Sequence, residues 1–187
     1  MKLTKEWLRG KSACSEGIKW FLEHNLKTVE GVTKKLIAED KLDWANWLVS
    51  RAMNHKQQIQ YAIFAAEQVI DIYEKQYPND DRPRKAIKAA KAYLNKPTEE
   101  NKAAAYAAHA AAYAAADAAA ANAAAYAAAY AAYAAAYAAY AAYATHTAYT
   151  AAYVAAYAAY TAYAAHAAMK TKIIIYGLKL IAEAGRG

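Results

Sequence analysis

The sequence has few of the large aliphatic and aromatic residues from which most protein cores are built. Leu, Ile, Val and Phe together account for 28 of the 187 residues, or about 15%, whereas a share below about 20% usually indicates disorder. Gly occurs six times and Pro three times, and neither occurs between Pro97 and Gly177. The only cysteine is Cys14. These absences exclude a disulfide-bonded scaffold and a multi-cysteine zinc site.

Alanine and tyrosine take the place of the missing residues. Of the 66 residues from 103 to 168, 43 are Ala and 13 are Tyr. Ala is the strongest helix former, so neither disorder nor a sheet-rich fold is expected. We predict an all-α fold over residues 1–187, a single domain built as a multi-helix bundle. Short amphipathic helices over 1–97 are followed by long Ala/Tyr-rich helices that fold back on one another over 98–187.

Two helices of the first half have clear sequence signals. Apolar residues at i, i+4 and i+7 spacing predict a helix over 55–76. A second helix, over 82–95, follows Asp81, a suitable N-cap, and has Pro83 in its first turn. Further N-caps are predicted at Thr28 and Thr98.

The Ala/Tyr segment is too long to form one helix in a compact protein. As a single helix it would extend about 100 Å, against a radius of gyration of roughly 16 Å for a domain of this size. From Tyr137 to Tyr149 the large residues lie three apart, so their stripe moves around a straight helix. We therefore predict breaks near 117–122 and 145–147, and a final helix over 169–184.

The formal net charge of +7 is spread along the chain. It favours anionic partners, but the sequence lacks the dense Lys/Arg block of a dedicated DNA-binding protein, so sequence-specific nucleic acid is not an expected partner. The N-terminus lacks the apolar run of a signal peptide. The Ala/Tyr segment lacks the strongly apolar residues of a membrane span. We expect a cytoplasmic protein without a membrane partner.

The sequence contains no motif for catalysis or metal binding. Paired carboxylates, a Gly-rich phosphate loop and a Ser–His–Asp set are all missing. No two of the five histidines lie three or four residues apart, the spacing at which a helix presents metal ligands. We predict a protein that is not an enzyme and holds no metal or cofactor, and in which Cys14 is a structural thiol.

A basic helix start is the first candidate for ligand binding. Arg82 and Arg84 lie at the predicted N-terminus of the helix over 82–95. Backbone amides, the helix dipole and guanidinium groups together suit a phosphate. The alternative is a local network in which the preceding aspartates pair with these arginines.

The predicted chain reversal near 145–147 is the second candidate. Its rings and hydroxyls suit stacking and hydrogen bonding to a planar ligand. The alternative is that the tyrosines pack in the core. The candidate residues are Tyr140, Tyr143, His146 and Tyr149.

The run from Tyr61 to Ala90, with its acid–Arg–Pro–Arg segment at 81–84, resembles the core motif of an immunity-protein family of bacteria and phages. Members of that family are Ala-rich helical proteins associated with toxin-immunity or conflict loci. The Ala-rich surroundings of His109 and His146 also resemble the C-terminal half of the family. The resemblance covers about 42–170, and it implies neutralisation of a partner without a known chemistry.

We therefore expect a protein that binds and neutralises in the conflict between bacteria and phages, encoded by one or the other. In one hypothesis it sequesters a small anionic ligand, a nucleotide-type immune signal. In another it is an immunity protein that blocks a protein toxin by direct contact, although a net charge of +7 disfavours this for nucleases, whose active sites favour acidic blockers. A third possibility is a Tyr-rich homo-oligomer without a ligand.

Overall fold

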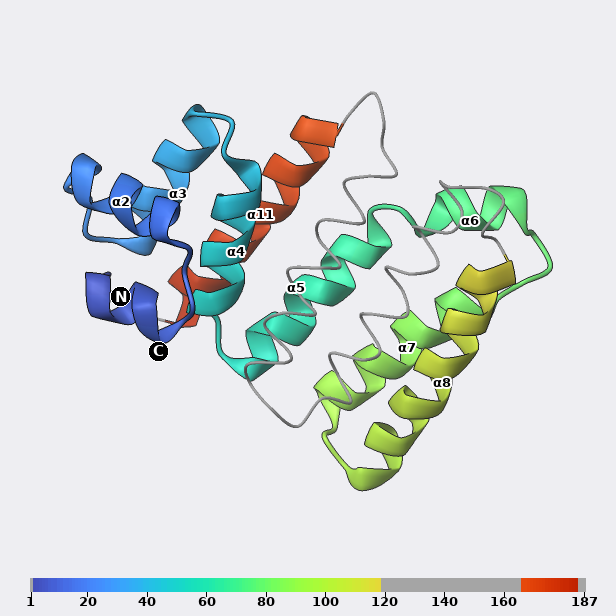
Figure 1. Cartoon of the computed structure of the whole chain (residues 1–187). Coiled ribbons are helices and arrows are strands. Elements are labelled where there is room, and N and C mark those ends of the chain that lie inside the picture. Colours follow the sequence, from blue (N-terminus) through green and yellow to red (C-terminus); the bar gives the residue numbers. More distant parts are fainter. Residues whose placement is uncertain (1, 119–165, 185–187) are drawn as a thin grey trace.

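The structure, a computed structural model, describes residues 2–118 and 166–184 (Figure 1). Among these residues no strand forms, and the only bridge joins Lys2 to Thr28. The helices pack against one another, so the predicted all-α multi-helix bundle is confirmed. They are α1 (Lys5–Gly10), α2 (Ser15–His24), α3 (Val29–Ala38), α4 (Leu42–Ala52), α5 (His55–Glu67), α6 (Ile70–Gln76), α7 (Arg82–Asn95), α8 (Glu99–Ala118) and α11 (His166–Ala184).

Side-chain caps begin several of these helices. Thr4, Cys14 and Thr28 each accept a hydrogen bond from the backbone N–H three residues further on, at 3.1, 3.3 and 3.1 Å. Asn54 caps α5 in the same way, and Thr98 accepts from the N–H of Asn101 at 3.2 Å. Each cap satisfies one backbone donor that the first helical turn leaves without a partner. The predicted N-caps at Thr28 and Thr98 are confirmed.

The prediction of one continuous helix over 55–76 is wrong. The chain forms α5 and α6 instead, with Gln68 and Val69 between them. Val69 leaves the helical conformation, at φ −129° and ψ −8°. It is β-branched, a class with reduced helix propensity, and its side chain is fully buried. Burial of Val69 outweighs the helical periodicity of the surrounding sequence.

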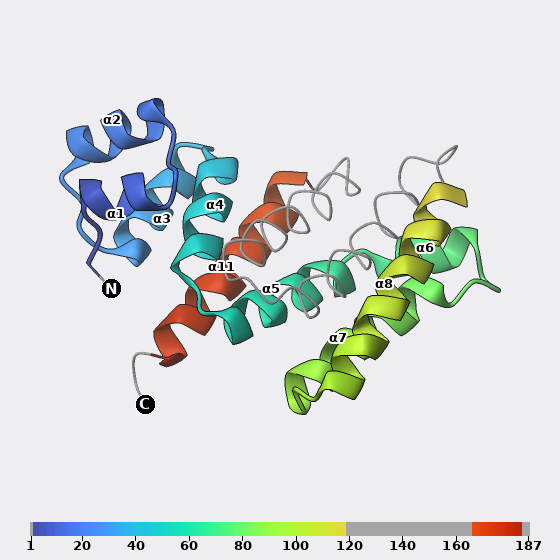
Figure 2. The same cartoon turned by 60° about the horizontal axis from the view of Figure 1, so that its bottom comes forward.

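The last helix, α11, returns to the first half of the chain and lies against α3, α4 and α5 (Figures 1 and 2). Gly177 permits this close approach. A Cβ atom there would lie 2.4 Å from Val49 Cγ1, 2.7 Å from Met53 Cε and 2.9 Å from Tyr61 Cε2. The Nε2 of Gln57 donates a hydrogen bond of 2.6 Å to the carbonyl of Leu180. The predicted helix over 169–184 is confirmed and begins three residues earlier.

The helices α7 and α8 pack side by side through alanine (Figure 2). The buried residues described in α8 are Ala105, Ala112 and Ala115, while Tyr106 and Tyr113 are about half exposed. In the described part of this helix the buried side chains are therefore alanines, and the tyrosines are more exposed. The predicted break near 145–147, and most of that near 117–122, lie outside the described residues.

Candidate binding site

An apolar pocket lies among the first four helices, α1 to α4. Its volume is about 350 Å³, at the lower end of the roughly 300–1,000 Å³ typical of ligand pockets. Three indole side chains line it, those of Trp20, Trp44 and Trp47. Polar lining comes from Ser12, Cys14 and Asp43, and the remaining residues are aliphatic, phenylalanine or glycine. Such a lining suits an apolar or aromatic group.

Helical spacing places two of the indoles together. Trp44 and Trp47 are three residues apart in α4, so they share one side of the helix. Both are half-buried. Lys41 Nζ lies 5.7 Å from the ring centre of Trp44, and Arg51 Cζ lies 6.0 Å from that of Trp47. These are cation–π distances, so each ring is held by a neighbouring cation as well as by the core.

The start of α2 forms another part of the wall. Cys14 is the N-cap of α2, with its Sγ atom accepting from the N–H of Gly17, in agreement with the predicted structural role of this thiol. A Cβ atom at Gly17 would meet only Cys14 Sγ, at 3.3 Å. Because Gly17 lines the pocket, a larger side chain there would crowd Cys14 and reduce the room at this part of the wall.

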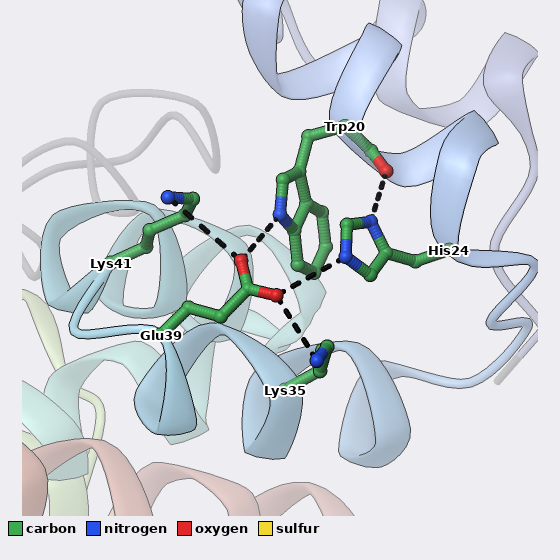
Figure 3. A network of polar contacts seen from close by, with 5 residues as sticks. All are labelled: Trp20, His24, Lys35, Glu39 and Lys41. Atoms are coloured by element: carbon green, nitrogen blue, oxygen red, sulfur yellow. Dashed lines mark hydrogen bonds and ion pairs between the residues drawn. The ribbon is translucent and has the colours of Figure 1, made fainter.

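Trp20 is fixed by a polar network centred on Glu39 (Figure 3). The indole Nε1 donates to Glu39 Oε2 at 2.7 Å, and the ring stacks on His24 at 4.1 Å between centroids. His24 Nε2 and Lys35 Nζ each lie 3.1 Å from the other carboxylate oxygen, and Lys41 Nζ lies 3.8 Å from Oε2. The Trp20 hydrogen bond is the main cause of a lowered pKa at Glu39, which burial partly opposes.

An ion pair ties the pocket to the last helix. Lys170 of α11 lies 2.5 Å from Asp43 Oδ1, and its side chain is only 8% exposed. Burial of a lysine is costly unless a carboxylate accompanies it, and Asp43 supplies that carboxylate. The acid that lines the pocket is thus paired with a cation from α11.

The structure places Arg82 and Arg84 at the start of α7, as predicted, in contact with carboxylates. Arg82 donates from Nε at 2.9 Å and from Nη2 at 2.6 Å to the two oxygens of Asp80. Arg84 donates from Nε to Glu74 Oε1 at 2.6 Å and from Nη2 to Asp71 Oδ1 at 3.1 Å. These carboxylates occupy donors that a bound phosphate would need.

For Arg82 the arrangement is the acid–arginine network considered as the alternative from the sequence, whereas Arg84 pairs with acids of α6 instead of the preceding aspartates. Asp80, not Asp81, accepts from the backbone N–H of Arg82, at 3.1 Å, and also from the Tyr73 hydroxyl, at 2.6 Å. The Arg82 hydrogen bond is the first cause of a pKa of Asp80 well below its usual range. The hydrogen bond from Arg84 to Glu74 is the main reason that the Arg84 pKa is raised.

The remaining predicted site residues, Tyr140, Tyr143, His146 and Tyr149, lie outside the described residues. The structure therefore does not relate them to Arg82 and Arg84. Sequence reasoning used the tryptophans only as markers of helices and missed the pocket that they line. The signal was their distribution, because all four tryptophans of the chain lie within its first 47 residues.

Within residues 2–118 and 166–184, no group of three or more His, Cys, Asp or Glu side chains is arranged to hold a metal ion. Over the same residues, no helix has the length and apolar character needed to cross a membrane.

A comparison with protein-family models finds a match over the part of the chain that forms the pocket. A family model described as the YdhT N-terminal domain matches residues 1–56, the part of the chain that contains α1 to α4 and every residue lining the pocket. No curated protein and no solved structure matches the chain. The first 56 residues are thus similar to a domain found in other proteins.

Proposed function

We propose that this protein works by binding rather than by catalysis, and that it captures a partner polypeptide by enclosing an apolar anchor side chain in the tryptophan-lined pocket. The observation that carries the proposal is the pocket itself, about 350 Å³ of apolar space among four short helices. Apolar cavities of about 150 Å³ take up benzene, so there is room for a bicyclic ring or for two smaller side chains. Aromatic anchors of this kind dominate the binding energy of protein interfaces.

This proposal corresponds to the second hypothesis from the sequence, a protein that neutralises a toxin by direct contact inside a bacterial cell. The resemblance to an immunity-protein family supports it. The paired state of Arg82 and Arg84 lends less support to sequestration of a small anion, because both guanidinium groups already bind carboxylates.

The pocket is tested first with indole as a small probe. Because Cys14 is the only cysteine and lines the pocket, bound indole slows its reaction with a thiol reagent such as dithionitrobenzoate. Gly17→Leu fills the pocket and abolishes the protection by indole. Gly10→Leu is the matched control, since nothing lies within 4 Å of a Cβ atom at Gly10.

Capture of a polypeptide is tested by selecting from a random peptide library on the three proteins. We expect peptides with a conserved Trp, Phe or Leu to be enriched on the wild type and on Gly10→Leu, and lost on Gly17→Leu. Equal enrichment on all three proteins, or no protection of Cys14 by indole, overturns the proposal.

The anion hypothesis has its own test, a calorimetric titration with ATP of the wild type and of Arg84→Ala. If Arg84 serves the scaffold, the variant melts at a lower temperature and ATP releases no heat of binding with either protein. The opposite result is that Arg84→Ala binds ATP at least tenfold more weakly, a difference of about 1.4 kcal/mol, and melts at an unchanged temperature. That result would show that the ligand binds at the start of α7.

A further inference from the structure

A second concave surface lies on α1 and α2, lined by residues different from those of the tryptophan pocket except for Ala13. Its volume is about 600 Å³. Ile18 and Leu22 form its apolar part, and the Leu22 side chain is 53% exposed. Leu22 is among the large hydrophobic residues that the described part of the chain leaves open to solvent.

Cations surround this apolar strip. Lys5 and Arg9 of α1 and Lys19 of α2 line the groove, against one acid, Glu23. No ion pair or side-chain hydrogen bond among the described residues engages these three cations. They differ in this from Lys170, Arg82 and Arg84, which are paired.

We infer that this groove binds an acidic amphipathic segment of a partner polypeptide, with apolar side chains on Ile18 and Leu22 and carboxylates on Lys5, Arg9 and Lys19. The inference rests on the proposed function, since it names the chemistry of the captured polypeptide. Charge complementarity selects the occupant. Among the described residues, Lys5, Arg9 and Lys19 make no ion pair and outnumber the nearby acids Glu6 and Glu23, so the groove repels a basic segment and attracts an acidic one. The helices α1 and α2 lie at one edge of the molecule, far from α7 and α8 (Figures 1 and 2). At that edge a long segment has access to the groove.

The test uses a fluorescein-labelled peptide of about 14 residues, which spans about 21 Å as a helix. Leu occupies positions i, i+3, i+4 and i+7, and Glu occupies most others. Fluorescence anisotropy measures its binding to the wild type, to a reversed variant (Lys5→Glu, Arg9→Glu, Lys19→Glu) and to a control variant. The control (Lys56→Glu, Lys88→Glu, Lys96→Glu) makes the same change in net charge at exposed lysines elsewhere.

We expect the reversed variant to bind the acidic peptide at least tenfold more weakly than the control variant. Circular dichroism verifies that both variants fold, and a neutral variant (Lys5→Gln, Arg9→Gln, Lys19→Gln) replaces the reversed one if it does not. Binding by the wild type should also weaken as the salt concentration rises from about 0.05 M to about 0.5 M, because salt screens exposed charges.

Equal affinities for the reversed and control variants overturn the inference, as does binding to vesicles containing phosphatidylglycerol without binding to the peptide. The variant Gly17→Leu distinguishes a failure of this inference from a failure of the proposed function. If the library peptides lose binding in that variant while the acidic peptide never binds, the pocket proposal survives and this inference fails. If the acidic peptide binds Gly17→Leu as it binds the wild type, the groove acts without the pocket.

Discussion

In two regions of this protein the helices pack against one another through different side chains. The N-terminal bundle, α1 to α4 with α11, buries Leu, Val, Ile, Trp and Phe, whereas the alanine pair, α7 with α8, is joined mainly through Ala. Large rings and branched chains bury much apolar area per residue, and in the N-terminal bundle they also line the tryptophan-lined pocket. Alanine brings two helices close together and contributes little area per residue.

The comparison shows where a pocket forms in a helical protein that has few large apolar residues. Many of those residues lie in the N-terminal bundle, which contains the pocket, although α5 and α6 also bury large side chains such as Tyr61 and Tyr73. In the alanine pair, Tyr93 of α7 is partly buried, while Tyr106 and Tyr113 of α8 are about half exposed. Mutations at matched positions measure how differently the two regions are stabilised.

The largest effect is expected from Leu36→Ala in the N-terminal bundle. Leu36 is 3% exposed, and truncation of a buried leucine costs about 2–5 kcal/mol of unfolding free energy. Leu22→Ala, at a residue that is 53% exposed, should cost under about 0.5 kcal/mol. Urea unfolding followed by circular dichroism measures both. Equal losses at the two positions contradict the burial that the structure assigns.

Gly177→Ala should destabilise by about 2–3 kcal/mol, because the added Cβ forces α11 away from α4 and α5. The nearest obstacle, Val49 Cγ1 at 2.4 Å, is branched and buried, so it has little freedom to move. Gly10→Ala is the control, and it should be neutral or slightly stabilising because its Cβ meets nothing within 4 Å. If Val49→Ala restores stability to Gly177→Ala, the clash with Val49 is the cause.

In the alanine pair, Ala112→Gly should cost about 1–2 kcal/mol. About 1 kcal/mol comes from lower helix propensity, and about 0.8 kcal/mol comes from the lost buried methyl group. Ala114→Gly, at an exposed position of the same helix, should show the propensity cost alone. If the two variants lose the same unfolding free energy, close packing of α8 on α7 adds nothing to stability.

The smallest effect is expected at the start of α7, and it depends on pH. Because the pKa of Asp80 is lowered in the folded protein, its bond to Arg82 stabilises above the ordinary value of about 3.8 and is lost as the pH falls below it. Asp80→Asn should therefore lower stability by about 1 kcal/mol at pH 7, with the difference from the wild type shrinking below pH 4.

Asp81→Asn is the matched control for this measurement. Asp81 pairs with Lys85 at 3.0 Å, and both side chains are about two-thirds exposed, so its loss should cost under about 0.5 kcal/mol. Thermal melts at several pH values compare the two variants. A larger effect at Asp81 than at Asp80 contradicts the network described around Arg82.

The sequence by itself determined the helical class, the caps at Thr28 and Thr98 and the final helix. These features depend on groups only a few residues apart, such as the Thr28 hydroxyl and the N–H of Gly31. Alanine content acts in the same local way, since helix propensity is a property of each residue in its own backbone. The side-chain cap predicted at Asp81 is wrong, because Asp81 occupies the N-cap position of α7 without a capping hydrogen bond from its side chain. The break at Val69 was missed because the apolar periodicity of the sequence continues through this buried residue.

Only the tertiary structure decided where a ligand group has room. The pocket requires α1 to α4 to pack around it, and its mouth includes Asp43 held by Lys170, a residue 127 positions away. The same holds for the arginines, because Arg84 is neutralised by Asp71 and Glu74 from α6 and not by its immediate neighbours. Sequence spacing fixes which side chains share a helix face, whereas the charge and space available at a site depend on contacts between helices.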